Sequence, residues 1–242
     1  MSKIIYIAGL GHSGSTILDM SLGTLKGVVG LGEIKTILDK STMNNHLKSV
    51  CSCGKTGYYC AFWNKIPDIL DENKSLLENY ESLLLYTEEE YGKDCVIVDS
   101  SKNSYSYLEA LSKKNDLKTV YLTRDIRSWC YSRHLSTGKP VLYFILRWVL
   151  ENAKLRIQFR KMNISYLNVG YEELALMPHI ILKNLAINLE LNYSDSMLTP
   201  GKTHSHIISG NIARTDPVKK SSWIYDSRWL LSRRMLLYGP LF

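Results

Sequence analysis

The sequence has no long apolar run, no internal repeat and no low-complexity tract. One apolar stretch, Val141 to Leu150, is interrupted by Arg147 and has about half the length that a membrane-crossing helix needs. The amino-terminal segment leads into a glycine loop rather than a small-residue cleavage site, so it does not resemble a secretory signal peptide. We therefore expect no membrane span and a soluble, cytoplasmic protein.

Cysteine is scarce, with five residues in 242, and an odd number without a secretion signal argues against a disulfide framework. Three of the five form the pattern Cys51-x-Cys53-Gly-x5-Cys60 inside a segment, residues 41–63, that we interpret as an insertion. A zinc knuckle there lacks an obvious fourth ligand, although His46 is nearby. We therefore interpret these cysteines as reduced structural residues and predict no metal in the reaction.

Long runs of charge are also missing. The formal net charge is +7 and the pI is near 9.0, but the longest Lys/Arg runs are pairs. Without a basic arm we predict no nucleic-acid partner. The basic surplus suits an anionic ligand, and simple solubility explains it equally well.

The order of the predicted elements indicates the fold. A chain of 242 residues that is 45% hydrophobic fits one α/β domain over 1–242. Alternating patterns predict strands at 3–8, 28–31, 95–98, 119–122 and 165–169, and helices at 16–25, 69–91, 105–113, 126–135 and 141–162. Residues 41–62 are predicted irregular, and the last forty residues receive no assignment. Strands alternating with helices predict a three-layer domain with a mainly parallel sheet.

Three loops that follow predicted strands carry the polar groups of interest, at 9–16, 99–102 and 123–133. In parallel α/β sheets, ligands bind at the carboxyl ends of the strands. The sequence therefore predicts that these loops meet at one site.

The first of these loops, Gly9 to Thr16, has glycines at Gly9, Gly11 and Gly14 and opens a predicted helix. Such a loop points several N–H groups at one anion. It fits G-x-G-x-x-G, which favours a dinucleotide, and nearly fits G-x-x-x-x-G-K-[ST]. Ser15 stands where the lysine that reaches a triphosphate should be, so the pattern favours a ligand with a 5′-phosphate and no triphosphate.

The segment from His12 to Thr16, His-Ser-Gly-Ser-Thr, resembles the 5′-phosphosulfate loop of sulfotransferases that use 3′-phosphoadenosine-5′-phosphosulfate (PAPS). That loop usually reads Lys or Arg, then Ser-Gly-Thr-Thr, in a P-loop-NTPase-like fold. The resemblance implies that the donor is bound by Gly11, His12, Ser13, Gly14, Ser15 and Thr16. His12 takes the basic position, where a neutral imidazole donates one hydrogen bond and an imidazolium also supplies charge.

A second segment, residues 120–133, resembles the 3′-phosphate site of the same family, in which a serine follows an arginine by eight positions. Arg124 and Ser132 have this spacing, and an arginine leaving a strand can fork onto a phosphate. The segment 209–214 resembles the late basic glycine loop, which implies a role for Asn211 and Arg214. The Val98 to Lys102 and Tyr171 to Leu174 segments also resemble those of bacterial members.

Sulfuryl transfer needs an in-line nucleophile, a base and cations around the transferring oxygens. Glu33 is the candidate base, because some branches of the family place a catalytic glutamate at this point. Asp99 and His12 are the alternative bases, and Glu33 as a helix-capping residue is the non-catalytic interpretation. We expect Lys102 to stabilise charge on the sulfuryl or bridging oxygen.

The resemblance implies a small-molecule, lipid or sugar acceptor with a hydroxyl or an amine, and release of adenosine 3′,5′-bisphosphate. Two alternatives stay open: a Rossmann-type NAD(P)-dependent oxidoreductase in which Glu33 holds a ribose hydroxyl, and a catalytically silent nucleotide-binding protein. The sequence specifies neither the acceptor nor the oligomeric state.

Overall fold

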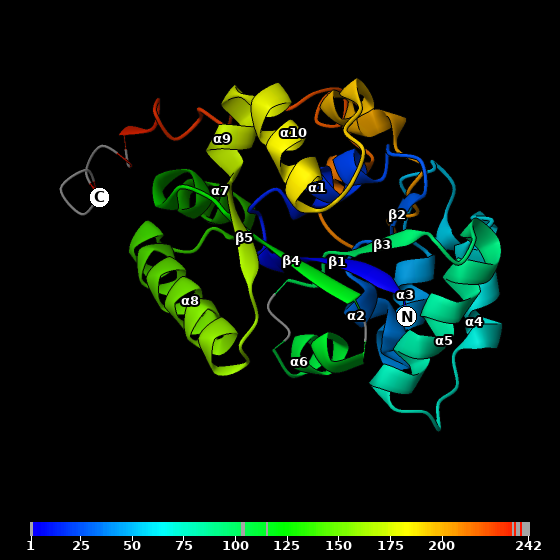
Figure 1. The fold of residues 1–242 in the computed structure, drawn as a ribbon. Coiled ribbons are helices and arrows are strands. Elements are labelled where there is room, and N and C mark those ends of the chain that lie inside the picture. Colours follow the sequence, from blue (N-terminus) through cyan, green and yellow to red (C-terminus); the bar gives the residue numbers. More distant parts are fainter. Residues whose placement is uncertain (1, 103–104, 115, 234, 236–237, 239–242) are drawn as a thin grey trace.

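The structure, a computed structural model, describes residues 2–102, 105–114, 116–233, 235 and 238. Its strands form one sheet in the order β2-β3-β1-β4-β5 (Figure 1), and every pairing between the named strands is parallel. The strands are β1 (Lys3–Gly9), β2 (Val28–Gly30), β3 (Val96–Asp99), β4 (Asp116–Thr123) and β5 (Tyr166–Gly170). This confirms the predicted parallel sheet and all the strands predicted from the sequence.

The strand order bears on the dinucleotide alternative. In the dinucleotide-binding fold, β1 lies beside β2 in the order 3-2-1-4-5-6. Here β3 lies between β1 and β2, which is an edge strand. Glu33, which follows β2, is therefore not on the strand beside the glycine loop, and the order argues against the Rossmann-type interpretation.

Helices cover both faces of the sheet, as the three-layer prediction requires (Figure 1). Along β1, Ile5 and Ile7 pack against α1 (Ser15–Leu22) and α10 (Pro178–Asn188), near α9 (Tyr171–Leu176). The alternate side chains, Ile4 and Tyr6, face the opposite layer, because successive side chains of a strand point to opposite sides. That layer contains α2 (Ile34–Leu38), α3 (Lys40–Leu47), α4 (Ile66–Ile69), α5 (Leu76–Tyr91), α6 (Tyr105–Lys114) and part of α8 (Val141–Lys161).

Some element boundaries differ from the prediction. The predicted helix 69–91 is divided, because Ser75 and Glu78 form a capping box that starts α5 after a loop. Residues 41–62 are not wholly irregular, since Asp39 caps α3 by accepting a hydrogen bond from the Ser41 N–H at 3.0 Å. The helix predicted at 16–25 ends three residues early, at Leu22.

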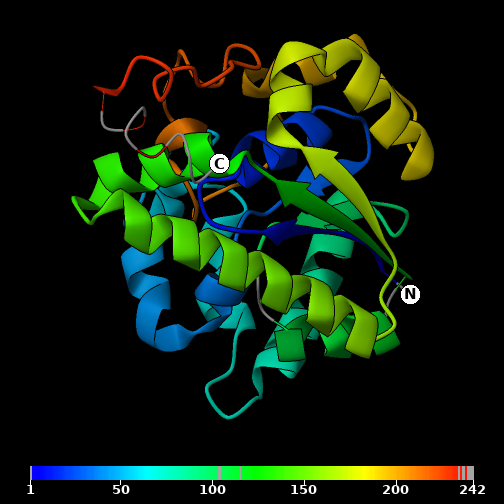
Figure 2. The same ribbon diagram turned by 90° about the vertical axis from the view of Figure 1, so that its left-hand side faces the viewer.

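The carboxyl-terminal segment lies on the side of the molecule toward which the strands point (Figure 2). It follows α10 through short 3-10 turns, including Ile212–Arg214, and forms no strand among its described residues. α7 (Ile126–Thr137) and α8 lie beside it, where Trp129 and Phe144 form an apolar cluster with Met235. The segment is thus placed to cover loops at the carboxyl edge of the sheet.

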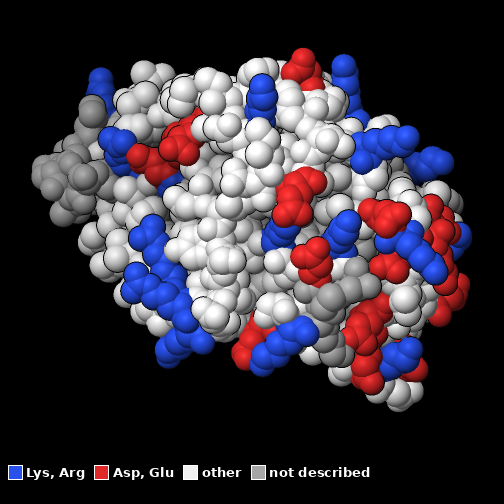
Figure 3. Space-filling model, in the orientation of Figure 1, with Lys and Arg blue, Asp and Glu red and all other residues white. Residues whose placement is uncertain are grey.

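Charge is unevenly distributed over the surface. Figure 3 shows basic side chains gathered along α8, which ends in Arg160 and Lys161, and acidic side chains over α5. The net charge of +7 therefore does not by itself locate an anion site. In the part of the chain that the structure describes, no helix combines the length and apolar character that crossing a membrane requires.

Candidate active site

The glycine loop joins β1 to α1 and requires glycine at two positions. Gly9 has φ 148°, and a Cβ there would lie 2.4 Å from the carbonyl oxygen of Leu122 on the neighbouring strand. Gly14 caps α1 in the left-handed conformation at φ 95°, and a Cβ there would lie 2.6 Å from the ring of Tyr171. The first N–H groups of a helix have no carbonyl partner within the helix, so those of Ser15 and Thr16 are oriented to receive an anion.

A cavity of about 370 Å³ opens beside this loop, within the range of small-molecule sites. Its cationic lining residues are Lys102, Arg124, Lys219 and Arg228. The other predicted site residues that line it are His12, Gly14, Ser15, Thr16, Ser132 and Asn211. Loops from distant parts of the sequence therefore meet in one cavity. Gly11, Ser13, Glu33 and Arg214 do not line it.

Arg124 is buried, and its guanidinium has a partner on each nitrogen. Nε donates to the Ser128 hydroxyl at 2.8 Å, Nη1 to the backbone carbonyl of His12 at 2.8 Å, and Nη2 to the Asp226 carboxylate at 2.6 Å. The guanidinium also lies 4.6 Å from the centre of the Tyr171 ring. Arg124 is thus fixed against the glycine loop, and it lines the cavity.

Asp226 balances that charge from the carboxyl-terminal segment. Burial alone would raise the pKa of Asp226, but the hydrogen bond from Arg228 and the charge of Arg124 outweigh it and hold the pKa at about 2. Asp226 is therefore ionised at neutral pH. A phosphate approaching Arg124 competes with this carboxylate for the same N–H group.

His12 lies in the cavity wall in a left-handed conformation, with φ 72°. Its pKa is lowered to about 4, first by burial and then by the nearby charges of Arg133 and Lys102. Its Nδ1 lies 3.4 Å from the hydroxyl of Ser132. In this state His12 is a neutral imidazole at pH 7, so it supplies a hydrogen-bonding group and no permanent positive charge.

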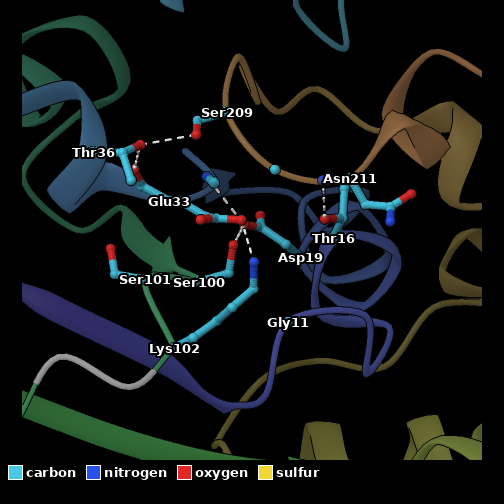
Figure 4. A network of polar contacts seen from close by, with 12 residues as sticks. Gly11, Thr16, Asp19, Glu33, Thr36, Ser100, Ser101, Lys102, Ser209 and Asn211 are labelled. Atoms are coloured by element: carbon cyan, nitrogen blue, oxygen red, sulfur yellow. Dashed lines mark hydrogen bonds and ion pairs between the residues drawn. The ribbon is translucent and has the colours of Figure 1, made fainter. Parts of the chain in front are cut away.

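The carboxylate of Glu33 forms an ion pair with the ammonium of Lys102 (Figure 4). Glu33 stands at the start of α2, where its carbonyl accepts a hydrogen bond from the Thr36 hydroxyl at 2.7 Å. Its side chain does not cap the helix, and it points to Lys102 at the border of the cavity. The structure therefore brings the predicted base and the predicted cation together.

Lys102 is placed by the turn that follows β3. It has φ 67°, unusual for a residue with a Cβ, and its carbonyl accepts a hydrogen bond from the Tyr6 hydroxyl at 3.0 Å. Asp99 braces this turn through the N–H and hydroxyl of Ser101, at 2.9 and 2.5 Å. Asp99 is wholly buried, does not line the cavity, and burial raises its pKa to about 6. As an alternative base it is badly placed, and its contacts give it a positioning role.

Asp19, a residue of α1 that the sequence did not single out, belongs to the same polar network as Glu33 and Lys102 (Figure 4). Its Oδ2 accepts hydrogen bonds from the Gly32 N–H at 3.1 Å and the Ser100 hydroxyl at 3.0 Å. Its Oδ1 has no partner among the described residues, and burial raises the pKa well above its ordinary value. Asp19 thus ties α1 to the two loops that carry Glu33 and Lys102.

The late loop contacts the glycine loop through Asn211, whose N–H donates to the Thr16 hydroxyl at 3.2 Å. Arg214 turns away from the cavity, because Nη1 donates to the carbonyls of Gly210 and Asn211 at 2.9 and 3.1 Å and Nε to that of Val50 at 3.1 Å. Asn211 and Ala213 of the predicted loop therefore reach the cavity, and Arg214 does not.

Sequence reasoning missed much of the cavity wall. Lys219, Trp223, Tyr225, Asp226 and Arg228 line it, all from the last forty residues. No strand or helix periodicity marks this segment, and its aromatic and basic composition was the available signal. Tyr171 also lines the cavity. The sequence indicated it only as part of the Tyr171 to Leu174 segment, which resembles a segment of bacterial sulfotransferases.

Three solved structures are similar to this fold over most of the chain. A sulfotransferase domain from the curacin biosynthetic pathway has a TM-score of 0.58 at 15% identity, covering 100% of this chain and 97% of its own. A sulfotransferase domain from the olefin synthase of Synechococcus PCC 7002 has a TM-score of 0.53 at 14% identity, with coverages of 99% and 94%. The sulfotransferase STF1 from Mycobacterium tuberculosis H37Rv has a TM-score of 0.50 at 14% identity, with coverages of 85% and 72%.

No protein-family model matches the sequence, and the search of curated proteins gives no match. At these identities the structural likeness establishes the fold alone. The chain has the P-loop-like sulfotransferase fold, as the resemblance of its glycine loop predicted.

Proposed function

We propose that this protein is a PAPS-dependent sulfotransferase that transfers a sulfuryl group to a hydroxyl or amine of a small-molecule, lipid or sugar acceptor. The observation that carries the proposal is the meeting of the glycine loop and Arg124 in one cavity, since Arg124 donates to the His12 carbonyl inside that loop. The sulfotransferase fold supports it independently.

The groups of the cavity suit a nucleotide with two separate phosphate positions. The N–H groups at the start of α1, with Thr16, suit the 5′-phosphosulfate. Arg124 and Ser132 suit the 3′-phosphate, and the rings of Trp223 and Tyr225 offer apolar surface for a base. A ligand with a single phosphate would leave either the start of α1 or Arg124 without a phosphate to bind.

In the proposed sulfuryl transfer, the protein's own residues remove a proton from the acceptor and stabilise developing charge. PAPS supplies the sulfuryl group, and adenosine 3′,5′-bisphosphate leaves. Glu33 takes the acceptor proton as the acceptor oxygen or nitrogen bonds to sulfur and the bond from sulfur to the phosphate oxygen breaks. Lys102, between Glu33 and the cavity, stabilises the charge that develops on the oxygens around sulfur.

The proposal is tested by incubating the protein with PAPS labelled in the sulfuryl group and a panel of hydroxylated and aminated small molecules. We expect a labelled product together with stoichiometric adenosine 3′,5′-bisphosphate. The Glu33→Gln variant is the matched control, because it keeps the cavity and removes the proposed base. A labelled product formed equally fast by this variant would contradict the role of Glu33.

Two observations favour a second candidate, a nucleotide-binding protein without catalysis. His12 replaces the basic residue of the loop and is neutral at pH 7, and Arg124 is paired with Asp226. Tight bisphosphate binding without transfer to any acceptor in the panel would favour this candidate.

A further inference from the structure

Three cysteines of one short segment and a histidine far along the chain converge outside the cavity. The sulfurs of Cys51, Cys53 and Cys60 and a ring nitrogen of His206 all lie within 4.8 Å of one another. The Cys53–Cys60 sulfur separation is 3.7 Å and the Cys51–Cys60 separation is 3.8 Å. His206 Nδ1 lies 3.1 Å from the Cys60 sulfur and 3.9 Å from the Cys51 sulfur. His46, the neighbour suggested by the sequence, is not part of this cysteine–histidine cluster.

We propose that the cysteine–histidine cluster binds a structural Zn²⁺ ion. A tetrahedral zinc with bonds of about 2.3 Å to sulfur and about 2.0 Å to nitrogen separates its sulfurs by about 3.8 Å and sulfur from nitrogen by about 3.5 Å. The two sulfur separations match the first value, and the two sulfur–nitrogen distances lie on either side of the second. Three thiolates and an imidazole are a ligand set that favours zinc.

The backbone holds the sulfurs in this arrangement without help from a metal. The Cys51 N–H donates to the Lys55 carbonyl at 2.8 Å, and the Gly54 N–H to the Cys51 carbonyl at 2.9 Å. Gly54 has φ 88°, so a glycine suits this tight turn between the first two cysteines and the rest of the knuckle. The Cys60 N–H donates to the Thr56 carbonyl at 2.8 Å and brings the third sulfur back to the turn.

His206 reaches the cluster from a segment 146 residues after Cys60 and is held from several sides. Its N–H donates to the Gly30 carbonyl at 2.9 Å, and its carbonyl accepts from the Trp63 indole at 2.6 Å. Its ring stacks on Phe62 with centroids 5.5 Å apart. A histidine held so firmly beside three thiols is oriented as a ligand, because orienting contacts are what metal-binding imidazoles require.

Alternative explanations for three converging cysteines fit less well. The sulfur separations exceed the disulfide bond length of about 2.05 Å, and all three thiols are free. A disulfide between two of the three cysteines would also leave the third thiol unpaired. With three thiolates the zinc-loaded site carries one net negative charge, and Arg214 lies beside it, since its Nε donates at 3.1 Å to the carbonyl of Val50, the residue before Cys51. This gives Arg214 a function that its position outside the cavity otherwise lacks.

The zinc ion would join residues 51–60 to the segment that leads into the late loop. Three residues after His206, the Ser209 hydroxyl lies 2.8 Å from that of Thr36 on α2 (Figure 4). A Cβ on Gly210 would lie 3.1 Å from the Thr16 hydroxyl and 3.5 Å from the Glu33 carboxylate. All four ligands come from the protein, so the ion takes no part in the reaction. It fixes the loop that passes between the glycine loop and Glu33.

The test is metal analysis of the full chain purified without chelator, with reconstitution by Zn²⁺ or Co²⁺. We expect about one zinc per chain, and a cobalt-substituted protein with thiolate charge-transfer absorption and the intense visible bands of a tetrahedral site. Cys53→Ser is the main variant, because Cys53 is exposed and its change does not disturb the core. We expect Cys53→Ser and His206→Asn to lose the zinc and to melt at a lower temperature than the wild type.

Cys95→Ser is the matched control, since Cys95 is a buried thiol outside the cluster. We expect it to retain the zinc. A wild-type protein that takes up no zinc on reconstitution would overturn the proposal. Equal zinc in the wild type and in both ligand variants would also overturn it, because the ion would then be bound elsewhere. None of these readouts depends on sulfuryl transfer, so the zinc site and the proposed function fail separately.

Discussion

Lys102 and Glu33 form an ion pair at the border of the cavity, which Lys102 lines and Glu33 does not. The pair joins the loop after β3 to the loop after β2, which lie side by side because the two strands are neighbours. The pair is the structural basis for assigning proton removal to Glu33.

Replacing Glu33 with glutamine tests this assignment. The amide keeps the size of the side chain but cannot accept the proton, so we expect kcat to fall by about 10²–10⁴. The Kd for adenosine 3′,5′-bisphosphate should stay within about threefold of the wild type, because Glu33 does not line the cavity. The two quantities are measured by product formation and calorimetry. An unchanged kcat would place the base elsewhere.

Removing the charge of Asp226 should strengthen nucleotide binding. Its carboxylate occupies an N–H group of Arg124 and repels phosphates. We expect Asp226→Asn to bind the bisphosphate about tenfold more tightly, or by ~1.4 kcal/mol. Asp195→Asn is the control, since it removes the same charge from a side chain that is 78% exposed and lies outside the cavity. Weaker binding by Asp226→Asn would show that the carboxylate supports the site rather than competing in it.

The low pKa of His12 predicts proton uptake on binding. In the ligand-free protein the imidazole of His12 has a pKa of about 4, and phosphates placed beside it favour the imidazolium and raise that pKa. Binding of the bisphosphate should therefore take up protons at pH values between the pKa of His12 in the free protein and its higher pKa in the complex. The affinity for the bisphosphate should rise as the pH falls from about 7 to about 5. Calorimetry in buffers of different ionisation enthalpy measures the uptake.

His12→Asn provides the control for this experiment, because the ligand phosphates titrate in the same pH range. The difference between the wild type and the variant isolates the imidazole. If the two proteins take up the same number of protons, His12 does not contact the phosphates.

Asp19 should make the protein less stable as the pH rises. Its pKa is raised well above 3.8 by burial, so the folded protein keeps this proton at pH values where the unfolded chain has lost it. The free energy of unfolding then falls as the pH rises from 3.8 to the folded pKa, by at most about 1.4 kcal/mol per pH unit. Urea unfolding from about pH 5 to 8 should show a shallower fall for Asp19→Asn than for the wild type. Parallel curves would mean that Asp19 is ionised in the folded protein.

Most of the fold was predictable because the signals are local. The run from Lys3 to Ala8 is apolar and β-branched, and Gly9 ends it, so strand and loop follow from neighbouring residues alone. The same holds for Arg124 at the end of β4 and for Glu33 after β2. Since ligand loops of parallel sheets meet at one edge, naming these strands also indicated where the site lies.

The remaining features depend on contacts between distant residues and leave no local pattern. His206, whose N–H pairs with the Gly30 carbonyl, completes the cysteine–histidine cluster from 146 residues beyond Cys60, and Asp226 reaches Arg124 across 102 residues of sequence. The ion pair of Lys102 with Glu33 spans 69 residues, so both residues could be named from the sequence but their pairing could not. The pKa of His12 likewise depends on burial and on cations that only the fold brings near.

We propose that the cavity binds a nucleotide through two phosphate positions, and calorimetry with adenosine 3′,5′-bisphosphate, AMP and NAD distinguishes this mode of binding from the alternatives. We predict micromolar binding of the bisphosphate, much weaker binding of AMP, and loss of this preference in Arg124→Ala. Because Arg124 is buried, Ser132→Ala serves as the milder variant and should reduce the preference in part. Equal affinity for AMP and the bisphosphate, or tighter binding of NAD, would contradict the claim.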